Sequence, residues 1–330
     1  MIRAGAIALL LAAVVAGGGW AAWWGGRPVG RGPVQRVQIP AGTSSGEIAR
    51  ILERRGLIRS AVVFSLYSWV LGFHGRLQAG EYDISPEEGT ERILRRLRMG
   101  DVVRHRLVLP EGITAREVAD RIEQAGLGRA DRFLALVRQP ARFWIPQMQG
   151  NRAGSLEGYL FPDTYLLPRG LPEEELVRIL VARFGEATRT LLSRPLPLGL
   201  SPHEVVTVAS LVEREARVPR ERARIAGVIY NRLRAGMPLQ IDASVLYALG
   251  VHRPVVRAQD LRLDSPYNTY RTKGLPPGPI GNPGLAALRA AVEPERHGYY
   301  YYVAQGDGTH LFSRTFEEHL KAIRRARNGR

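Results

Sequence analysis

The sequence contains no cysteine, which excludes disulfide bonds, thiolate metal sites and a cysteine nucleophile. Lysine is nearly absent as well, because Lys273 and Lys321 are the only two. The formal net charge of +16 therefore comes almost entirely from arginine. Such a balance suits a polyanionic partner, whether nucleic acid, anionic lipid or an anionic cell-wall polymer, although a GC-rich genome produces the same bias. No zinc-finger or RNA-recognition signature is present, and no basic run alternates with aromatic residues, so we expect no nucleic-acid partner.

Charged residues are also missing from residues 4–26, in a chain of 330 residues that is long enough for two domains. A helix over this run is long enough to span a hydrocarbon core of about 30 Å. Trp20, Trp23 and Trp24 stand where an interfacial aromatic belt is expected. We therefore predict a transmembrane signal anchor over 1–26. A cleaved signal peptide is the alternative, but its hydrophobic region is usually shorter and no clean A-x-A site follows. Arginines flank the run on both sides, so the positive-inside rule leaves its orientation open.

A Gly/Pro linker at 27–36 leads to an internal repeat of a short strand, a Pro-x-Gly turn and a helix. The first copy covers 37–57 and the second covers 107–127, with a further strand at 79–84 and a further helix at 90–97 between them. This arrangement resembles the LysM-like module that binds glycan strands, and a plain spacer is the alternative. We predict a LysM-like module at 37–104, a second LysM-like repeat with its connection at 105–150, and an α+β domain at 151–330 built around a central helix.

The central helix is expected over 201–216. Ser201 is a good N-cap, Pro202 suits the first helical position, and Glu204 completes a capping box. The apolar residues that follow recur at helical spacing and define one face of the helix. The helix is therefore predicted to pack its apolar face into the core of the last domain.

Two carboxylates near the end of this helix differ in their helical phase, that is, in the side of the helix on which they lie. Glu215 continues the apolar face, whereas Glu213 points roughly 160° away from it. Desolvation on such a face raises the pKa of a carboxyl group, as a general acid requires. The alternative is that both groups are surface carboxylates paired with neighbouring arginines. On phase alone, Glu215 is the candidate acid and Glu213 is a flanking residue.

A set of short motifs follows the central helix in a fixed order. They are Asn231-Arg-Leu, Leu239-Gln-x-Asp242, Tyr267-Asn-Thr-Tyr270, the Gly/Pro-rich stretch 274–284, and His310-x-Phe312. Upstream, Asp163 lies in the aromatic loop 157–165. With the E-x-E pair and the preceding hydrophobic run, this set resembles the MltG or YceG-like endolytic peptidoglycan transglycosylase family. The resemblance covers essentially the whole chain and is strongest over 157–319. One departure is the stretch 239–243, where relatives often carry Thr and Pro.

The resemblance implies a lytic transglycosylase of the inner membrane, with the bulk of the chain on the extracytoplasmic side. Its substrate would be peptidoglycan glycan strands, cut within the strand so that elongation is limited. The cytoplasmic membrane would hold residues 4–26, and peptidoglycan synthases are candidate protein partners. As aligned with the family, the catalytic residue is Glu215, and no metal or cofactor is expected.

In the implied reaction, protonated Glu215 donates its proton to the oxygen between MurNAc and GlcNAc. The same carboxylate then accepts the proton of the C6 hydroxyl, which attacks C1 and gives 1,6-anhydro-MurNAc. The candidates for binding the substrate are Gln240, Asp242, Asn268, Tyr270, His310, Asn231 and Asp163. For each of them, an ordinary structural hydrogen bond is the alternative.

Two other functions remain open on the sequence. One is a glycoside hydrolase in which Asp242 or Glu213 holds a water, although Glu213 and Glu215 on nearly opposite sides of one helix cannot clamp one sugar together. The other is a non-catalytic scaffold that binds the wall through the repeat. Product analysis and a Glu215→Gln variant separate these possibilities.

Overall fold

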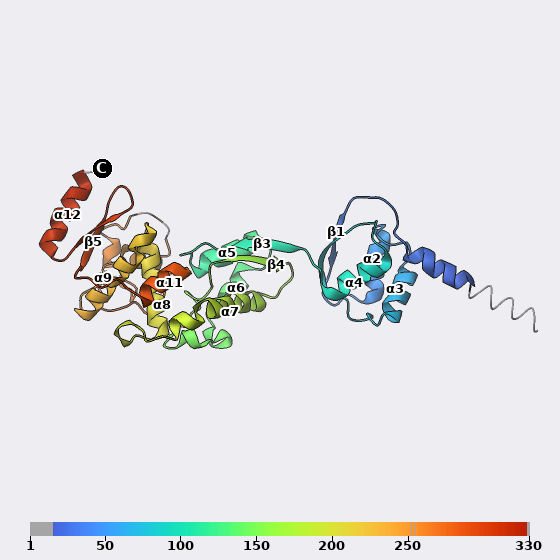
Figure 1. Ribbon diagram of the computed structural model, residues 1–330, viewed down its shortest axis with the longest axis horizontal. Helices are drawn as coiled ribbons and strands as arrows, with labels where there is room; N and C mark the ends of the chain where they lie inside the picture. The colour runs from blue at the N-terminus through green and yellow to red at the C-terminus, as the bar shows by residue number, and fades with distance from the viewer. Residues whose placement is uncertain (1–15, 252, 254, 329–330) are drawn as a thin grey trace, which may run out of the picture. The chain divides into compact units, whose positions relative to one another are not determined.

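The computed structural model describes residues 16–251, 253 and 255–328, and these form a mixed α+β protein (Figure 1). The chain divides into two compact units. Unit 1 comprises Met1–His105 and Leu166–Gly170, and unit 2 comprises Arg106–Tyr165 and Leu171–Arg330. Strand pairing in the described residues is limited to three two-stranded sheets and one isolated bridge.

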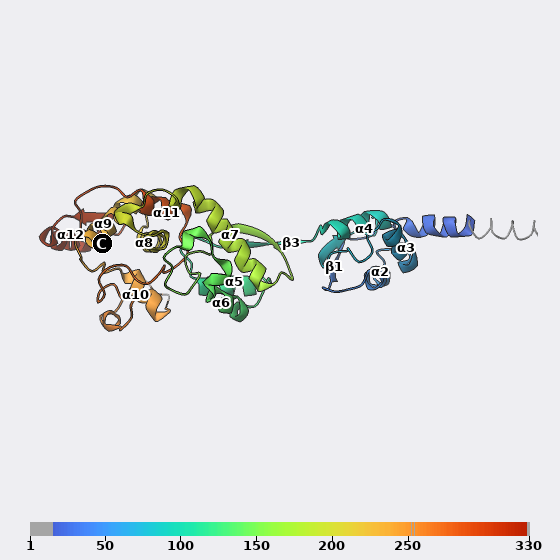
Figure 2. The same cartoon turned by 90° about the horizontal axis from the view of Figure 1, so that it is seen from below.

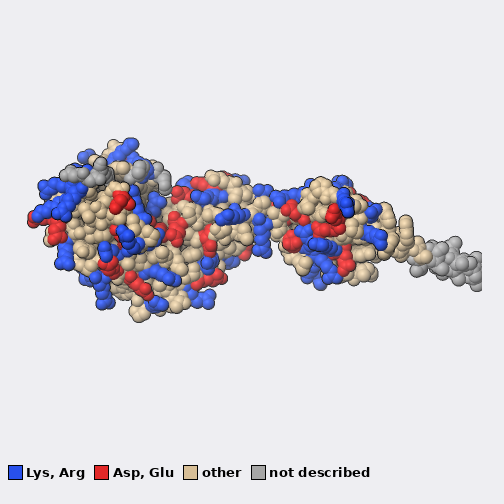
Figure 3. Space-filling model, turned by 45° about the horizontal axis from the view of Figure 1, so that its top comes forward, with Lys and Arg blue, Asp and Glu red and all other residues tan. Residues whose placement is uncertain are grey.

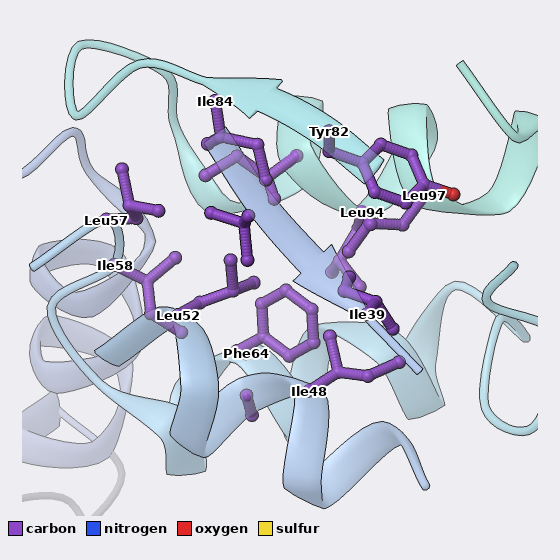
Figure 4. Close-up of a cluster of buried hydrophobic side chains, with 13 residues drawn as sticks. Ile39, Ile48, Leu52, Leu57, Ile58, Phe64, Tyr82, Ile84, Leu94 and Leu97 are labelled. Atoms are coloured by element: carbon purple, nitrogen blue, oxygen red, sulfur yellow. The ribbon is translucent and has the colours of Figure 1, made fainter. Parts of the chain in front are cut away.

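Unit 1 contains the first copy of the repeat. After a helix at 16–26, its elements are β1 (Gln35–Ile39), α2 (Ser45–Arg54), α3 (Ala61–Val70), β2 (Gly80–Ile84) and α4 (Thr90–Met99). Strands β1 and β2 pair antiparallel, with Val37 opposite Tyr82. Figure 4 shows side chains from both strands and from the helices meeting in one core, with Phe64 at its centre. Unit 1 therefore has a hydrophobic core of its own.

The predicted membrane span falls largely outside this description. Residues 4–15 lie outside the described part of the chain, and 16–26 are helical. Trp20, Trp23 and Trp24 are exposed on this helix. Within the described residues, no helix combines the length and apolar character that crossing a bilayer requires.

Unit 2 begins with the second copy of the repeat. Its elements up to the central helix are β3 (Arg104–Val108), α5 (Ala115–Gln124), α6 (Ala130–Val137), η1 (Pro140–Phe143), η2 (Pro146–Met148), β4 (Thr164–Pro168), α7 (Glu173–Leu192) and η3 (Pro197–Gly199). Strands β3 and β4 pair, and the boundary between the units falls within both of them. Helices α5 and α7 both pack against α6. The second copy is thus part of the same compact unit as the central helix.

The two copies share the same local chemistry. Gly42 and Gly112 in their Pro-x-Gly turns both have φ +79°, a conformation that side-chain-bearing residues rarely adopt. Helix α2 starts with a capping box from Ser44 and Glu47, and Thr114 forms the equivalent box at α5. The helices predicted at these positions from the repeat are present.

The remaining elements surround the central helix, α8 (Pro202–Glu215). They are η4 (Pro219–Glu221), α9 (Arg222–Arg234), α10 (Asp242–Leu249), η5 (Asp260–Arg262), α11 (Leu285–Val292), β5 (Tyr301–Ala304), β6 (His310–Ser313) and α12 (Phe316–Asn328). Helix α8 packs against α9, α10 and α11, and Figure 2 shows it enclosed by them. Strands β5 and β6 form a hairpin with Tyr302 opposite Phe312, and α12 packs on that hairpin.

The capping box predicted at Ser201 and Glu204 is confirmed, but α8 is more buried than the sequence indicates. His203 and every residue from Val205 to Val212 are buried, so the helix has no solvent-facing side along its middle turns. Its two ends are partly accessible, at Pro202 and Glu204 in the first turn and at the two carboxylates in the last turn. The apolar stripe therefore identified the helix correctly but not the full extent of its burial.

Candidate active site

Glu215 is the last residue of α8 and lies half-buried at the wall of a cavity. The hydroxyl of Tyr302, on β5, donates a hydrogen bond of 3.0 Å to its Oε2 atom. Burial raises the pKa of Glu215 to about 7, and the negative charge of Asp242 acts in the same direction. The Tyr302 hydrogen bond, Arg214 and Arg217 lower this pKa, but burial outweighs them. A large fraction of Glu215 is therefore protonated near neutral pH, as a general acid must be.

The cavity beside Glu215 has a volume of about 880 Å³, large enough for a sugar unit. Four of the predicted substrate-binding residues line it, namely Gln240, Asp242, Tyr270 and His310. His310, the farthest of them along the chain, stands 95 residues after Glu215, yet the packing of α8, α10 and β6 brings these residues to one place. The structure thus assembles the acid and most of the candidate polar groups around one space.

Asp242 and Tyr270 form a pair on this wall. The Tyr270 hydroxyl donates to Asp242 Oδ1 over 2.6 Å. Asp242 opens α10, where a carboxylate interacts favourably with the positive end of the helix dipole. Both groups therefore face the cavity in a defined arrangement, with a carboxylate that acts on Glu215 by its charge.

Gln240 is held in an unusual backbone conformation. Its φ is +52°, in the left-handed region that only glycine adopts freely. The backbone N–H of Gln240 donates to the Thr269 carbonyl, and its side-chain oxygen accepts from Arg232 over 3.2 Å. Arg232 is buried and also donates to the carbonyl oxygens of Pro238 and Leu239. Arg232 thus holds the loop that carries Gln240 against the cavity.

His310 is buried and oriented by a second carboxylate. Its Nδ1 atom lies 2.7 Å from Glu221 Oε2, and its backbone N–H donates to the other oxygen of Glu221. The imidazole meets the ring of Tyr302 edge-on, with centroids 5.4 Å apart. Glu221, His310 and Tyr302 therefore form a connected set of side chains that leads to Glu215.

The other predicted residues lie elsewhere. Asn268 is fully buried and bonds to the carbonyls of Leu261 and Leu263, and Asn231 donates to two backbone carbonyls near β5. Asp163 accepts from Arg183 and from Thr164. None of the three lines the cavity beside Glu215. Substrate binding by them stays a prediction, and each has a structural role that accounts for its polarity.

Glu213 leaves α8 on another side, as its phase indicates. It accepts from the backbone N–H of Gly284 over 2.9 Å and pairs with Arg222 over 3.3 Å. Its side chain is only 6% exposed, so it is not the surface carboxylate of the alternative interpretation. Glu213 ties α8 to α9 and to the Gly/Pro-rich stretch, which fits the flanking role predicted for it.

Tyr302, Arg232 and His319 also line the cavity, but they were not among the substrate-binding candidates predicted from the sequence. Tyr302 is one of four consecutive tyrosines at 299–302, and nothing local distinguishes it from its neighbours. The alternation of a strand would place two of the four on each face, but the face that meets Glu215 depends on how the hairpin packs. Among the described residues, no group of His, Asp or Glu side chains is arranged to hold a metal ion.

A sequence model of the YceG-like family matches residues 37–325. The chain belongs to the YceG-like family. It is 34% identical over 303 residues to the endolytic murein transglycosylase of Bacillus subtilis strain 168, a match that covers 87% of this chain and 83% of that protein. It is 31% identical over 316 residues to the endolytic murein transglycosylase of Streptococcus pneumoniae serotype 2 strain D39, covering 87% of this chain and 57% of that protein.

A solved structure agrees with this family assignment. The 2.6 Å crystal structure of a yceG-like protein from Listeria monocytogenes is 35% identical to this chain. The two superpose with a TM-score of 0.58, over 87% of this chain and 99% of that one. The YceG-like resemblance inferred from the ordered motifs is confirmed.

Proposed function

We propose that this YceG-like protein is an endolytic murein transglycosylase, an enzyme that cuts within the glycan strands of peptidoglycan. Two curated transglycosylases match most of the chain. The observation that carries the chemistry is Glu215, a half-buried carboxyl group with a pKa of about 7 at the wall of a cavity lined by sugar-compatible polar groups.

In the proposed mechanism, Glu215 begins the cycle protonated. It gives its proton to the glycosidic oxygen between MurNAc and GlcNAc, and the bond from C1 of MurNAc to that oxygen breaks. The C6 hydroxyl of the same sugar attacks the oxocarbenium-like C1, and Glu215, now a carboxylate, takes up the hydroxyl proton. The products are a 1,6-anhydro-MurNAc end and a free GlcNAc hydroxyl, and the enzyme returns to its protonated form. Because the nucleophile belongs to the substrate, one carboxyl group suffices.

The other residues of the cavity wall have supporting roles in this proposal. Asp242 is close enough to raise the pKa of Glu215 by its charge, and the same negative charge would stabilise the positive charge that develops at C1. Gln240, Tyr270 and His310 offer hydrogen-bonding groups for sugar hydroxyls and the acetamide. Tyr302 orients the Glu215 carboxyl through its 3.0 Å hydrogen bond.

The location is part of the proposal. The uncharged run at 4–26 would anchor the chain in the cytoplasmic membrane, with both units on the extracytoplasmic side, near peptidoglycan synthases. Cutting there would limit the length of nascent strands, and the LysM-like copies would hold the glycan. Lys and Arg are scattered among Asp and Glu over the face seen in Figure 3, and the net charge of +16 suits an anionic wall or lipid surface. Protease digestion of cells with a permeabilised outer layer, compared with lysed cells, tests this orientation.

One observation keeps a hydrolase as a second candidate. Asp242 is another carboxylate on the same cavity wall as Glu215, as a two-carboxylate mechanism would require. The two reactions differ in their products, because a hydrolase leaves reducing ends and a transglycosylase leaves anhydro ends. A scaffold that binds glycan without cutting it leaves neither.

The decisive experiment digests purified peptidoglycan with the full chain and with Glu215→Gln, and identifies the products by mass spectrometry. The wild-type enzyme should release anhydro-ended fragments, and Glu215→Gln should lower the rate by about 1,000-fold. Glu213→Gln is the matched control, because its carboxyl group lies two residues away and outside the cavity. Reducing ends from the wild type would favour the hydrolase, and full cleavage by a folded Glu215→Gln variant would refute the assignment of Glu215.

A further inference from the structure

A second cavity, of about 620 Å³, adjoins the one beside Glu215. The two cavities share three lining residues, Arg214, Ala243 and Leu246. Helix α10 forms the common wall, since Asp242 faces the first cavity and Tyr247 faces the second. The opposite side of the second cavity comes from α5, which belongs to the second copy of the repeat, and from α6, which follows that copy. The two cavities are therefore neighbours on either side of α10.

An aromatic pair lines the second cavity. The rings of Tyr247 and Tyr267 have centroids 5.1 Å apart, and both side chains are half-buried. Half-buried tyrosines offer an apolar face together with a polar edge, which suits the alternating faces and hydroxyls of a sugar ring. Neither tyrosine lines the first cavity, and the proposed catalytic steps use neither of them.

The polar floor of this cavity is formed by Glu157, whose carboxyl group already has hydrogen-bond partners within the protein. Glu157 is 5% exposed, and its carboxyl oxygens accept from the backbone N–H of Ala115, at the start of α5. The hydroxyl of Tyr247 donates to Glu157 Oε2 over 3.3 Å, and Asn282 donates to the other oxygen. The positive end of α5 is thus capped internally, so this floor favours a neutral polar ligand over an anion.

The rim of the cavity has a different character. Arg116 and Arg138 line it and are exposed, and within the described residues neither forms an ion pair with a carboxylate. Two unpaired guanidinium groups beside a neutral floor suit a ligand that is uncharged in its ring and carries carboxylates on a branch. A peptidoglycan strand has this chemistry, because each MurNAc ring carries a stem peptide with free carboxylates.

We infer that the second cavity is a saccharide subsite for the same glycan strand that reacts at Glu215, with the Tyr247–Tyr267 pair against a sugar ring and Arg116 and Arg138 toward the stem-peptide carboxylates. This inference rests on the proposed function. It assigns the second copy of the repeat a direct share in substrate binding through α5, together with α6 that follows it.

The first test measures binding of chito-oligosaccharides of increasing length to full-length Glu215→Gln, which holds substrate without turning it over. The affinity should rise with length, and adding Tyr267→Ala should remove the gain for the longest oligomers, weakening them about fivefold or more, while short oligomers are unaffected. Trp144→Ala is the control, because Trp144 is an exposed aromatic residue of unit 2 that lines neither cavity. An unchanged length dependence in Tyr267→Ala would overturn the subsite. Tyr247→Phe, which keeps the ring, should bind like the parent.

The second test addresses the rim. Arg116→Ala combined with Arg138→Ala should raise KM about tenfold on strands that carry stem peptides, and leave KM unchanged on strands stripped of peptide by an amidase. Arg132→Ala, an exposed arginine of α6 that does not line the cavity, should change neither value. Equal KM changes on both substrates would refute the assignment of the rim to the stem peptide.

These outcomes are separable from a failure of the proposed function. If the wild-type chain releases no anhydro-ended fragments, the function itself is wrong. If it does so while Tyr267→Ala binds long oligomers normally, only the subsite is wrong. Circular dichroism and thermal melting of each variant establish that the fold is retained.

Discussion

The Tyr302 hydroxyl donates to the Glu215 carboxylate over 3.0 Å, although 87 residues separate the two in the chain. This hydrogen bond lowers the pKa of Glu215, and burial raises it by more, to about 7. The pKa of the candidate acid is thus governed mainly by two opposed effects. The hydrogen bond from β5 lowers it, and the burial that results from the packing of α8 raises it.

Removing the hydrogen bond between Tyr302 and Glu215 should shift the pH dependence of kcat/KM to higher pH. Glu215 must be protonated to act as an acid, so kcat/KM should fall as the pH rises through about 7. In Tyr302→Phe the pKa of Glu215 loses an interaction that lowers it, so the basic limb of the pH profile should shift to higher pH. Tyr301→Phe is the control, since Tyr301 makes no hydrogen bond to Glu215. A limb that stays in place in Tyr302→Phe would show that another group limits the rate.

Removing the charge of Asp242 should have the opposite effect. The negative charge of Asp242 raises the pKa of Glu215, so Asp242→Asn should shift the basic limb of kcat/KM to lower pH. Asp264→Asn removes an exposed carboxylate outside the cavity and should leave the limb unchanged. Shifts in the same direction for Tyr302→Phe and Asp242→Asn would contradict the electrostatic account of this site.

The buried Glu157 should make folding stability depend on pH. Burial raises its pKa from 4.5 to about 7 in the folded protein. The stability that this group contributes is fully present below pH 4.5 and is lost as the pH rises through about 7, a change of about 3 kcal/mol. Urea denaturation of wild type and Glu157→Gln between pH 5 and 8 measures it. The wild type should lose stability relative to the variant across this range, and a constant difference would refute the assignment.

Asn282 should be among the most sensitive positions of unit 2. Its side-chain oxygen accepts from the backbone N–H groups of Gly158 and Leu160, and its amide donates to the Ile113 carbonyl. The residue is fully buried, and Asn282→Ala leaves the N–H groups of Gly158 and Leu160 without partners, although the Ile113 carbonyl keeps its bond from the backbone N–H of residue 282. The substitution should therefore lower the free energy of unfolding by about 3–5 kcal/mol.

A milder substitution provides the comparison for Asn282. Asn151 also bonds to backbone, at Ser155 and Ala153, but its loop is partly exposed. Water can replace those bonds, so Asn151→Ala should lower the free energy of unfolding by about 1 kcal/mol. Similar losses for the two variants in urea denaturation would show that burial does not set the energy of these amide bonds.

Local features of the fold followed from the sequence because they depend on neighbouring residues. The capping box at Ser201 and Glu204 is formed by residues three positions apart, and the turns at Gly42 and Gly112 require a conformation that glycine adopts freely. The same locality explains the choice between the carboxylates of α8, because helical phase alone separates Glu215 from Glu213.

The sequence by itself determined the helix that carries Glu215, the repeated strand–turn–helix unit and the order of motifs that marks the family. The tertiary structure alone decided which groups surround that carboxyl group. Tyr302, Asp242 and His310 reach the cavity through contacts between elements far apart in the chain. The raised pKa of Glu215 likewise depends on how completely the packed elements exclude water, and no spacing along the chain specifies that.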